Sequence, residues 1–304
     1  MSRSYMFYPG CSLEGTAGDF HKSTMALAGA LGIDLPEIPD WICCGATAAH
    51  QSDEMLALAL PAKSLLAAKG KRVAVCCAAC FSRLKAANHK ITSDPAVRQK
   101  VAKVVGADYD GQTPVVHMLE ILATDVGPAE IAKRVVKPLS GLKVACYYGC
   151  LLTRPPEVTQ LDDAEDPMLM DRLLQAAGAQ ALNWPHKTEC CGGSYSIPDV
   201  RTAKLLTGQV LAMARLAGAD CIAAACPLCQ INLDMRQADI EAETGEQFAL
   251  PVFYFTQLLG LAIGLGAKEL GLGALVVDPG KLLADKKISS GPIASPASCG
   301  RCAE

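Results

Sequence analysis

Ten of the fifteen cysteines in this chain form two sets of five that occur in the same order. In the first set, Cys11 is followed after 31 residues by the adjacent pair Cys43 and Cys44, and after 32 more by a CxxC motif, Cys77 and Cys80. In a chain without an export signal, many cysteines indicate thiolate ligands to a metal more often than disulfides. The first set therefore predicts a metal centre.

The second set repeats the first with small changes of spacing. Cys150 is followed after 39 residues by Cys190 and Cys191, and after 34 more by Cys226 and Cys229. The flanks repeat as well, since "YPGC" returns as "YYGC" and "CCGA" returns as "CCGG". Self-similarity of this kind indicates a duplicated domain.

Five thiols exceed what a simple metal site needs. Four thiolates are enough for a tetrahedral zinc ion or an ordinary four-iron cluster. Each set is therefore either four ligands with one reactive thiol, or the ligands of a cluster with an unusual ligand number. Adjacent cysteines diverge too far to share one small ion but can reach two irons of a cluster. The glycine after each pair lets backbone N–H approach inorganic sulfide. Zinc in both halves is the alternative.

Short apolar runs that end at the cysteines predict the elements that position them. "SYMFYPG" and "KVACYYG" read as strands ending at glycine, and "RVAVCC" and "CIAAAC" as buried strands ending at the CxxC motifs, with helices after them. Such alternation predicts an α/β unit with a largely parallel sheet. The carboxyl ends of parallel strands meet at one edge, so we expect the five cysteines of each set to converge there.

The bulk properties narrow the class of protein. The chain has 304 residues, 51% of them hydrophobic, which suffices for two domains with cores of their own. A net charge of −3 indicates neither a nucleic-acid surface nor a membrane surface. No apolar run reaches the roughly 18 residues of a membrane span, and the start shows no secretory signal. We expect a soluble, cytoplasmic protein.

The domain bounds follow from composition and from the repeat. We predict an N-terminal domain over residues 1–135 and a C-terminal domain over residues 136–277, divided near a segment with two prolines and several charges. Residues 278–304, rich in Pro, Ser, Gly and Lys, are predicted to form a flexible tail that carries a CxxC motif.

From residue 5 to about 265 the doubled cysteine pattern resembles the B-type, catalytic subunit of heterodisulfide reductases, a family with tandem cysteine-rich CCG domains. The resemblance implies an α/β fold with two pseudo-twofold-related domains, each a small, largely parallel sheet flanked by helices. It also implies that each domain holds a non-cubane 4Fe–4S cluster with five cysteine ligands. The implied ligands are Cys11, Cys43, Cys44, Cys77 and Cys80 in the first domain, and Cys150, Cys190, Cys191, Cys226 and Cys229 in the second.

The resemblance further implies an enzyme, a disulfide oxidoreductase that works as one component of a complex. The chain would cleave or form a disulfide, or process a lipoate-bound sulfur species, between the two clusters. The sequence has no flavin or nicotinamide motif, so a ferredoxin-like iron–sulfur subunit and a flavoprotein subunit are implied as electron partners. Two other functions stay open. One is an electron-transfer iron–sulfur subunit of a lactate-, glycolate- or succinate-type oxidoreductase, and the other is a zinc-binding assembly scaffold.

Several further residues could take part. His50, six residues after Cys44, is a candidate proton donor to a departing thiolate, because histidine exchanges protons near neutral pH. A histidine on a helix face is the alternative. Cys299 and Cys302 have the spacing of an extra metal site or a docking motif, against a disordered tail as the alternative. Cys76 could compete with its neighbour as a ligand.

The remaining candidates are weaker. Cys146 and Cys221 lie in apolar strands and are predicted to be core residues. His117 is a minor candidate for chemistry because Tyr254 occupies its place in the second half. Arg154 lies just after a predicted ligand and could receive an anionic substrate.

Overall fold

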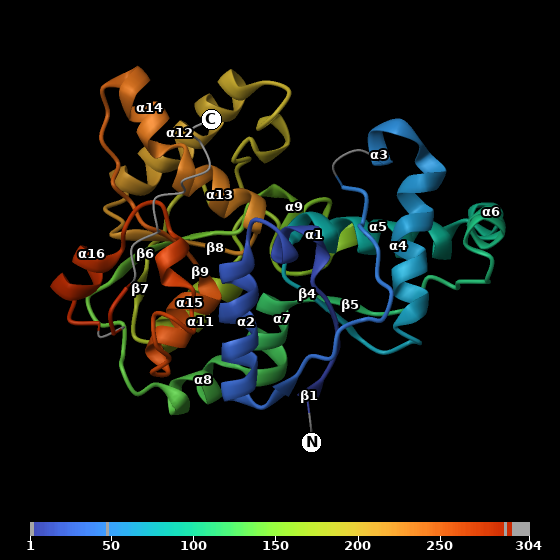
Figure 1. Cartoon of the computed structure of the whole chain (residues 1–304), viewed down its shortest axis with the longest axis horizontal. Coiled ribbons are helices and arrows are strands. Elements are labelled where there is room, and N and C mark those ends of the chain that lie inside the picture. Colours follow the sequence, from blue (N-terminus) through green and yellow to red (C-terminus); the bar gives the residue numbers. More distant parts are fainter. Residues whose placement is uncertain (1–2, 47–48, 289–290, 294–304) are drawn as a thin grey trace, which may run out of the picture.

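Small parallel sheets form the frame of the molecule, one of three strands and one of two strands in the first half of the chain and one of four strands in the second (Figure 1). The computed structural model describes residues 3–46, 49–288 and 291–293. The first half contains β1 (Arg3–Ser4), β2 (Met6–Tyr8), β3 (Ile33–Asp34), β4 (Val73–Val75) and β5 (Val115–His117). The second contains β6 (Lys143–Tyr147), β7 (Gln180–Ala181), β8 (Cys221–Ala224) and β9 (Val252–Tyr254).

The order of the strands is the same in both halves. The first sheet runs β2-β4-β5, with β1 paired to β3 beside it, and the second runs β7-β6-β8-β9. Every pair is parallel; Tyr8 lies opposite Val75 and Tyr147 opposite Ala224. The central strands β4 and β8 are buried along their whole length, which explains their continuous apolar sequences. The predicted α/β fold with small parallel sheets is confirmed.

Helices connect the strands and cover the sheets. In the first half they are α1 (Gly10–Glu14), α2 (Gly18–Leu31), α3 (Ala49–Ser52), α4 (Glu54–Ala67), α5 (Ala78–Ser93), α6 (Pro95–Val105), α7 (Met118–Glu120), the π-helical turn η1 (Ile121–Val126) and α8 (Pro128–Arg134). In the second they are α9 (Cys150–Thr153), α10 (Pro156–Thr159), α11 (Leu169–Ala176), η2 (Gly193–Tyr195), α12 (Val200–Leu216), α13 (Pro227–Met235), α14 (Gln237–Thr244), α15 (Phe255–Ala262), η3 (Leu272–Ala274) and α16 (Gly280–Asp285).

Local signals in the sequence account for several helix ends. Helix α2 ends at Gly32, whose left-handed φ of 68° suits glycine and terminates the helix. The carboxylate of Asp94 accepts from the backbone N–H groups of Ala96 and Val97 and so caps the start of α6. Asp199 caps α12 in the same way through the N–H of Thr202.

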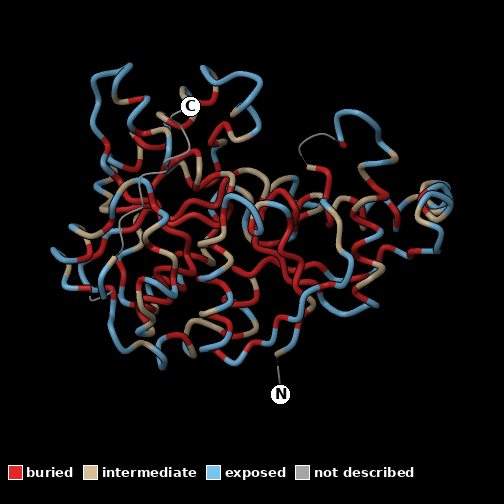
Figure 2. Tube along the Cα trace, viewed as in Figure 1, coloured by how far each residue is buried: buried red, intermediate tan, exposed pale blue. Residues whose placement is uncertain are grey.

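The two halves share one core. Helix α2 of the first half packs against α15 of the second, as Figure 1 shows near the centre of the molecule. The rings of Phe20 and Tyr254 stack with their centroids 4.0 Å apart, and Ser23 Oγ lies 2.7 Å from Thr256 Oγ1. Buried residues run without a break from one sheet to the other (Figure 2). The halves are therefore docked through apolar and hydrogen-bonding contacts.

The start of the predicted tail is folded, which corrects the expectation of a flexible segment for residues 278–288. Helix α16 lies there, and Leu283 and Ile288 are buried against the core. Lys286 Nζ forms an ion pair with Asp220 Oδ2 at 2.7 Å. Burial of these two apolar side chains removes their surface from water and stabilises the docked segment. Cys299 and Cys302 lie outside the described residues.

Candidate metal centre

The strands of the first sheet deliver the first five cysteines to one edge. Cys11 lies in α1, directly after β2, and Cys77 precedes α5, directly after β4. Cys80 lies on the first turn of α5, and Cys43 and Cys44 lie in the connection between β3 and α3. The predicted placement at the carboxyl ends of the strands is therefore found in the structure.

The thiols of the first set approach one another in pairs. The Sγ atoms of Cys44 and Cys80 are 3.3 Å apart, and Cys80 also hydrogen-bonds to Cys77. Cys11 hydrogen-bonds to Cys43. Cys11 and Cys43 are exposed, whereas the other three are buried, so each set has an outer rim and an inner part.

The second set repeats this pattern of contacts. The Sγ atoms of Cys191 and Cys229 are 3.5 Å apart, Cys229 contacts Cys226, and Cys150 hydrogen-bonds to Cys190. Cys150 and Cys190 are half-buried and again form the outer rim.

The two sets meet at the junction of the halves. Cys77 hydrogen-bonds to Cys226, and the backbone N–H of Ala78 also donates to the Cys226 sulfur. A continuous line of six buried thiols thus crosses the molecule, formed in order by Cys44, Cys80, Cys77, Cys226, Cys229 and Cys191. The sequence alone predicted two separate convergences and gave no sign of this contact.

One tyrosine in each half holds the Cys-Cys-Gly loop. The Tyr8 hydroxyl donates to the Ile42 carbonyl at 2.6 Å, and the Tyr147 hydroxyl donates to the Glu189 carbonyl at 2.5 Å. Each carbonyl belongs to the residue just before the cysteine pair. Burial and the neighbouring thiols raise the pKa of both phenols, which therefore stay protonated donors. Sequence reasoning missed this role, although both tyrosines stand three residues before the first cysteine of their set.

The backbone near the sulfurs fits a cluster. Gly45 N–H donates to Cys43 Sγ at 3.4 Å and Gly192 N–H donates to Cys190 Sγ at 3.3 Å. A Cβ added to Gly10, which precedes the first ligand, would lie 3.0 Å from the Sγ of the CxxC cysteine behind it. The same holds at Gly149. The donor set is all sulfur, and the glycines leave room beside it, so these residues fit an iron–sulfur group.

The contacts shift the acidity of the thiols in opposite directions. Hydrogen bonding between Cys44 and Cys80 lowers the pKa of Cys44 to about 7, and hydrogen bonding between Cys150 and Cys190 lowers the pKa of Cys190 to about 6. The same hydrogen bonds and burial raise the pKa of their partners, Cys80 and Cys150. Thiolate is the form that binds metal, so Cys44 in the first set and Cys190 in the second are ready to ligate near neutral pH, and the pKa of Cys226 is lowered as well.

The thiols are not arranged around single ions. Among the residues that the structure describes, no group of three or more His, Cys, Asp or Glu side chains is placed to hold one metal ion. Contacts in pairs place the sulfurs in a row instead. Sulfur ligands surround the metal in a tetrahedral zinc site and in a cluster alike, so either group would require the paired sulfurs to move apart.

The other candidate residues occupy varied places. His50 lies on α3 with its side chain exposed. Cys76 is buried with its sulfur 3.6 Å from Thr24 Oγ1, and burial raises its pKa to about 12, as expected of a core thiol. Cys146 and Cys221 are fully buried in β6 and β8.

Arg154 contacts the loop that precedes Cys190. Its guanidinium donates to the Thr188 carbonyl at 3.4 Å and pairs with Glu165 at 2.8 Å. These bonds brace the loop, and they leave the guanidinium partly exposed.

Sequence reasoning also missed one polar residue near the cysteine pair in each half, Asn232 and Arg83. Asn232 Nδ2 donates to the Cys191 carbonyl at 3.3 Å. Arg83, at the matching place in the first half, helps to lower the pKa of the Cys44 thiol through its charge. Both residues stand three positions after the second cysteine of a CxxC motif, a register that the repeat alone could have revealed.

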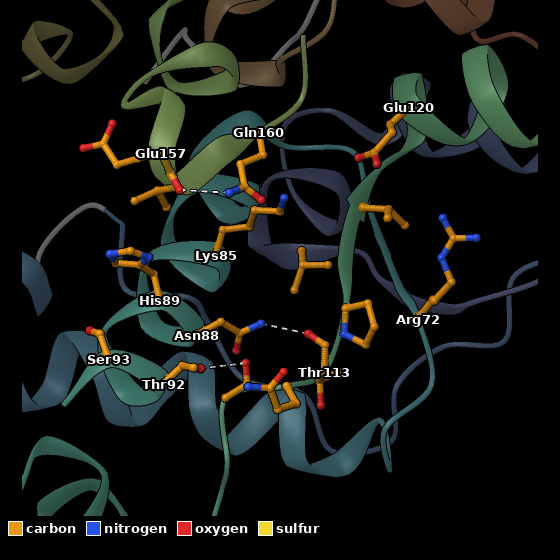
Figure 3. A pocket seen from close by; sticks show the side chains of 16 residues that line it. Arg72, Lys85, Asn88, His89, Thr92, Ser93, Thr113, Glu120, Glu157 and Gln160 are labelled. Carbon is orange, nitrogen blue, oxygen red and sulfur yellow. Dashed lines mark hydrogen bonds between the residues drawn. The ribbon is translucent and has the colours of Figure 1, made fainter. Parts of the chain in front are cut away.

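A polar cavity of about 620 Å³ lies beside β5 and is separate from the thiols (Figure 3). Helix α5, the residues around β5 and helix α10 form its walls. Asn88 Nδ2 donates to the Thr113 carbonyl at 2.7 Å, and Lys85 Nζ donates to the Thr159 carbonyl at 2.7 Å. Because none of the ten predicted ligands lines this cavity, it is not part of the candidate centre.

Comparison with known proteins identifies the family. The chain belongs to the tandem CCG family that includes the B-type subunits of heterodisulfide reductases, since the model of the cysteine-rich domain matches residues 5–85 and 144–234. It is 31% identical over 273 residues to the B-type subunit of the ferredoxin/F(420)H(2)-dependent CoB-CoM heterodisulfide reductase of Methanosarcina acetivorans, and the match covers 87% of this chain and 91% of that protein. The predicted resemblance is confirmed.

Two further proteins are similar over most of the chain. The 8-methylmenaquinol:fumarate reductase membrane anchor subunit of Wolinella succinogenes is 34% identical over 287 residues, which covers 93% of this chain and 100% of that protein. The crystal structure of a hypothetical protein from Helicobacter pylori matches with a TM-score of 0.72 and 13% identity, over 90% of this chain and 51% of that one. The structural match establishes a shared fold alone.

Within the described ranges, none of the helices combines the length and the apolar character needed to cross a membrane.

Proposed function

We propose that the chain is the catalytic iron–sulfur subunit of a heterodisulfide reductase-like complex, which cleaves or forms a disulfide or processes a lipoate-bound sulfur species. The observation that carries this proposal is the line of six buried thiols between two rims of paired thiols. The similarity to the B-type subunits of heterodisulfide reductases over most of the chain supports it.

Two non-cubane 4Fe–4S clusters, when bound, would each supply one of the two electrons that disulfide cleavage requires. The first five cysteines would hold one cluster and the second five the other. Tyr8 and Tyr147 fix the loops that carry the adjacent pairs, and Gly10 and Gly149 leave room beside the inner thiols.

The rims define how a substrate would approach. Cys11 and Cys43 are exposed and Cys150 and Cys190 are half-buried, so the outer ligands face the medium while the inner ones face the core. Cleavage of a disulfide consumes two electrons and two protons and yields two thiols. His50, exposed on α3, is our candidate for one proton, and Arg154 is our candidate to hold an anionic substrate.

The electrons must come from partner subunits. We propose a ferredoxin-like iron–sulfur subunit and a flavoprotein subunit within a cytoplasmic complex. The names of the relatives from Methanosarcina, which include ferredoxin as a reductant, support this choice. The proposed substrate-handling role belongs to residues 5 to about 265.

Metal analysis tests the proposal directly. Anaerobically purified protein should contain about eight irons and eight sulfides per chain, as two four-iron clusters require. The EPR signal of the oxidised protein should change when a thiol is added. Two zincs per chain without sulfide would contradict the proposal and would favour a zinc-binding scaffold.

Ligand variants sharpen this test. Cys43→Ser and Cys191→Ser should each lower the iron content, because each removes one predicted ligand. Cys221→Ala is the matched control, since it removes a buried thiol that contacts neither set. Unchanged iron in the two serine variants, with the control behaving alike, would show that the ligand assignment is wrong.

A second function is favoured by one observation. The Wolinella succinogenes relative is matched over its whole length and is named as a fumarate reductase subunit. This favours electron transfer without disulfide chemistry, as in a succinate-, lactate- or glycolate-type oxidoreductase. A protein that contains about eight irons per chain but whose EPR spectrum does not change when a thiol is added would support this second function.

A further inference from the structure

One imidazole stands at the junction of the two halves and touches both. The ring of His117 is fully buried between Phe81 of the first half and Phe255 of the second, at centroid distances of 5.8 and 6.4 Å. His117 ends β5, whose carboxyl end faces the junction.

The hydrogen bonds of His117 define its tautomer. The backbone N–H of Leu119 donates to Nδ1 at 3.2 Å, so Nδ1 must be the unprotonated acceptor. Nε2 therefore carries the hydrogen and donates it to the Cys76 carbonyl at 2.7 Å. Burial lowers the pKa of the imidazole to about 4, so the ring is neutral near pH 7 and keeps this tautomer.

The same ring interacts with the second half. The backbone of Ala225 and the sulfur of Cys226 both lie close enough to the imidazole to affect its charge. Cys76 and Ala225 occupy the same place in the repeat, since each directly precedes the first cysteine of a CxxC motif. His117 thus binds the backbone before the first motif, lies beside the backbone before the second, and packs against Phe255 of the second half.

We propose that His117 is a positioning residue that fixes the two CxxC segments relative to each other and thereby sets the contact of Cys77 with Cys226. The proposal rests on the proposed function, because the two thiols are predicted ligands of different clusters. These two thiols join the two sets, so their relative position would affect how strongly two bound clusters interact.

The repeat supplies a matched control. Tyr254 ends β9 as His117 ends β5, but its hydroxyl bonds to Gln230 Oε1 at 3.2 Å and its ring stacks on Phe20. Loss of that hydroxyl therefore removes a bond at the equivalent position without removing a bond to either CxxC backbone.

Three variants test the proposal in the full chain. His117→Phe keeps a buried ring but removes the N–H donor, whereas His117→Gln keeps a donor of similar reach. Tyr254→Phe is the control. With equal iron loading, we expect His117→Phe to shift the cluster midpoint potentials and alter the EPR line shape, and the other two variants to retain the wild-type values. Wild-type potentials and spectrum in His117→Phe would overturn the proposal.

A measurement on iron-free protein separates the two proposals. Diamide accepts two electrons and two protons as two thiols form a disulfide, and the linked Cys77 and Cys226 peptides are identified by mass spectrometry after digestion. We expect His117→Phe to form this link several-fold more slowly than wild type, and an equal rate would overturn the proposal. If His117→Phe does not fold, the test rests on His117→Gln. A wild-type rate of linking and wild-type midpoint potentials in His117→Gln would support the proposal. A changed rate or changed potentials would overturn it. A wild-type protein without iron or sulfide would refute the proposed function alone.

Discussion

At the scale of single residues, the tyrosine hydroxyls do more than fill the core. Tyr147→Phe removes the bond that the buried Tyr147 hydroxyl donates to the Glu189 carbonyl. We expect the free energy of unfolding of iron-free protein to fall by about 1–2 kcal/mol, and the iron content to fall with it. Urea unfolding and iron analysis measure both. Tyr195→Phe, on an exposed ring near the same loop, is the control; an equal loss there would contradict the assigned role.

A second residue, Asp234, should make the free energy of unfolding depend on pH. Burial raises the pKa of Asp234 from 3.8 to about 6, although the carboxylate accepts from the N–H groups of Val276 and Val277. Between these two values the folded chain keeps a proton that the unfolded chain has released. The free energy of unfolding contributed by this group therefore falls as the pH rises from about 4 to about 6, by about 3 kcal/mol.

The test compares Asp234→Asn with wild type in iron-free form. The variant cannot titrate at this position, so its urea midpoint should change less steeply across that pH range. A slope identical to that of wild type would show that another group causes the dependence.

At the scale of elements, the glycine after each cysteine pair lets the loop pass close to a helix. Gly192 has a φ of 80°, and an added Cβ would lie 2.9 Å from the backbone Cα of Ala203 on α12. Gly192→Ala should therefore destabilise the iron-free protein by more than the strain of its φ alone, about 1 kcal/mol.

The control for this prediction has the same backbone conformation without the crowding. Gly218 has a φ of 77°, and nothing lies within 4 Å of an added Cβ. Gly218→Ala should cost only the strain. Urea unfolding measures the free energy of unfolding of both variants. An equal decrease in the two would show that the close approach of the loop to α12 does not affect stability.

The elements also show what the sequence could and could not predict. The convergence of each cysteine set was predictable, because parallel strands place their carboxyl ends together whatever surrounds them. The contact between Cys77 and Cys226 was not, because it depends on how two folded halves pack, which no local pattern encodes. The folded segment around Leu283 was missed for a similar reason: its composition favoured disorder, and two apolar side chains outweighed it.

At the scale of the whole molecule, the shared core predicts that the halves unfold together. Phe20→Ala removes a fully buried ring that stacks on Tyr254 and should cost about 3–5 kcal/mol. Met25→Ala, on the exposed side of α2, should cost far less.

The two tryptophans serve as reporters for this prediction. Trp41 lies in the first half and Trp184 in the second. Urea unfolding of Phe20→Ala proteins that retain only one tryptophan should give the same midpoint from both positions. Two separate midpoints would mean that each half is stable alone and that the junction is weaker than its contacts indicate.

The unlike pair His117 and Tyr254 bears on how such a protein could have arisen. A homodimer must present identical side chains on both sides of its axis. A duplicated gene fused into one chain is free of that constraint. Here one copy of the position donates to backbone at the junction while the other stacks on a helix from the opposite half. Neither half alone could therefore rebuild this junction as a homodimer, because neither half carries both His117 and Tyr254.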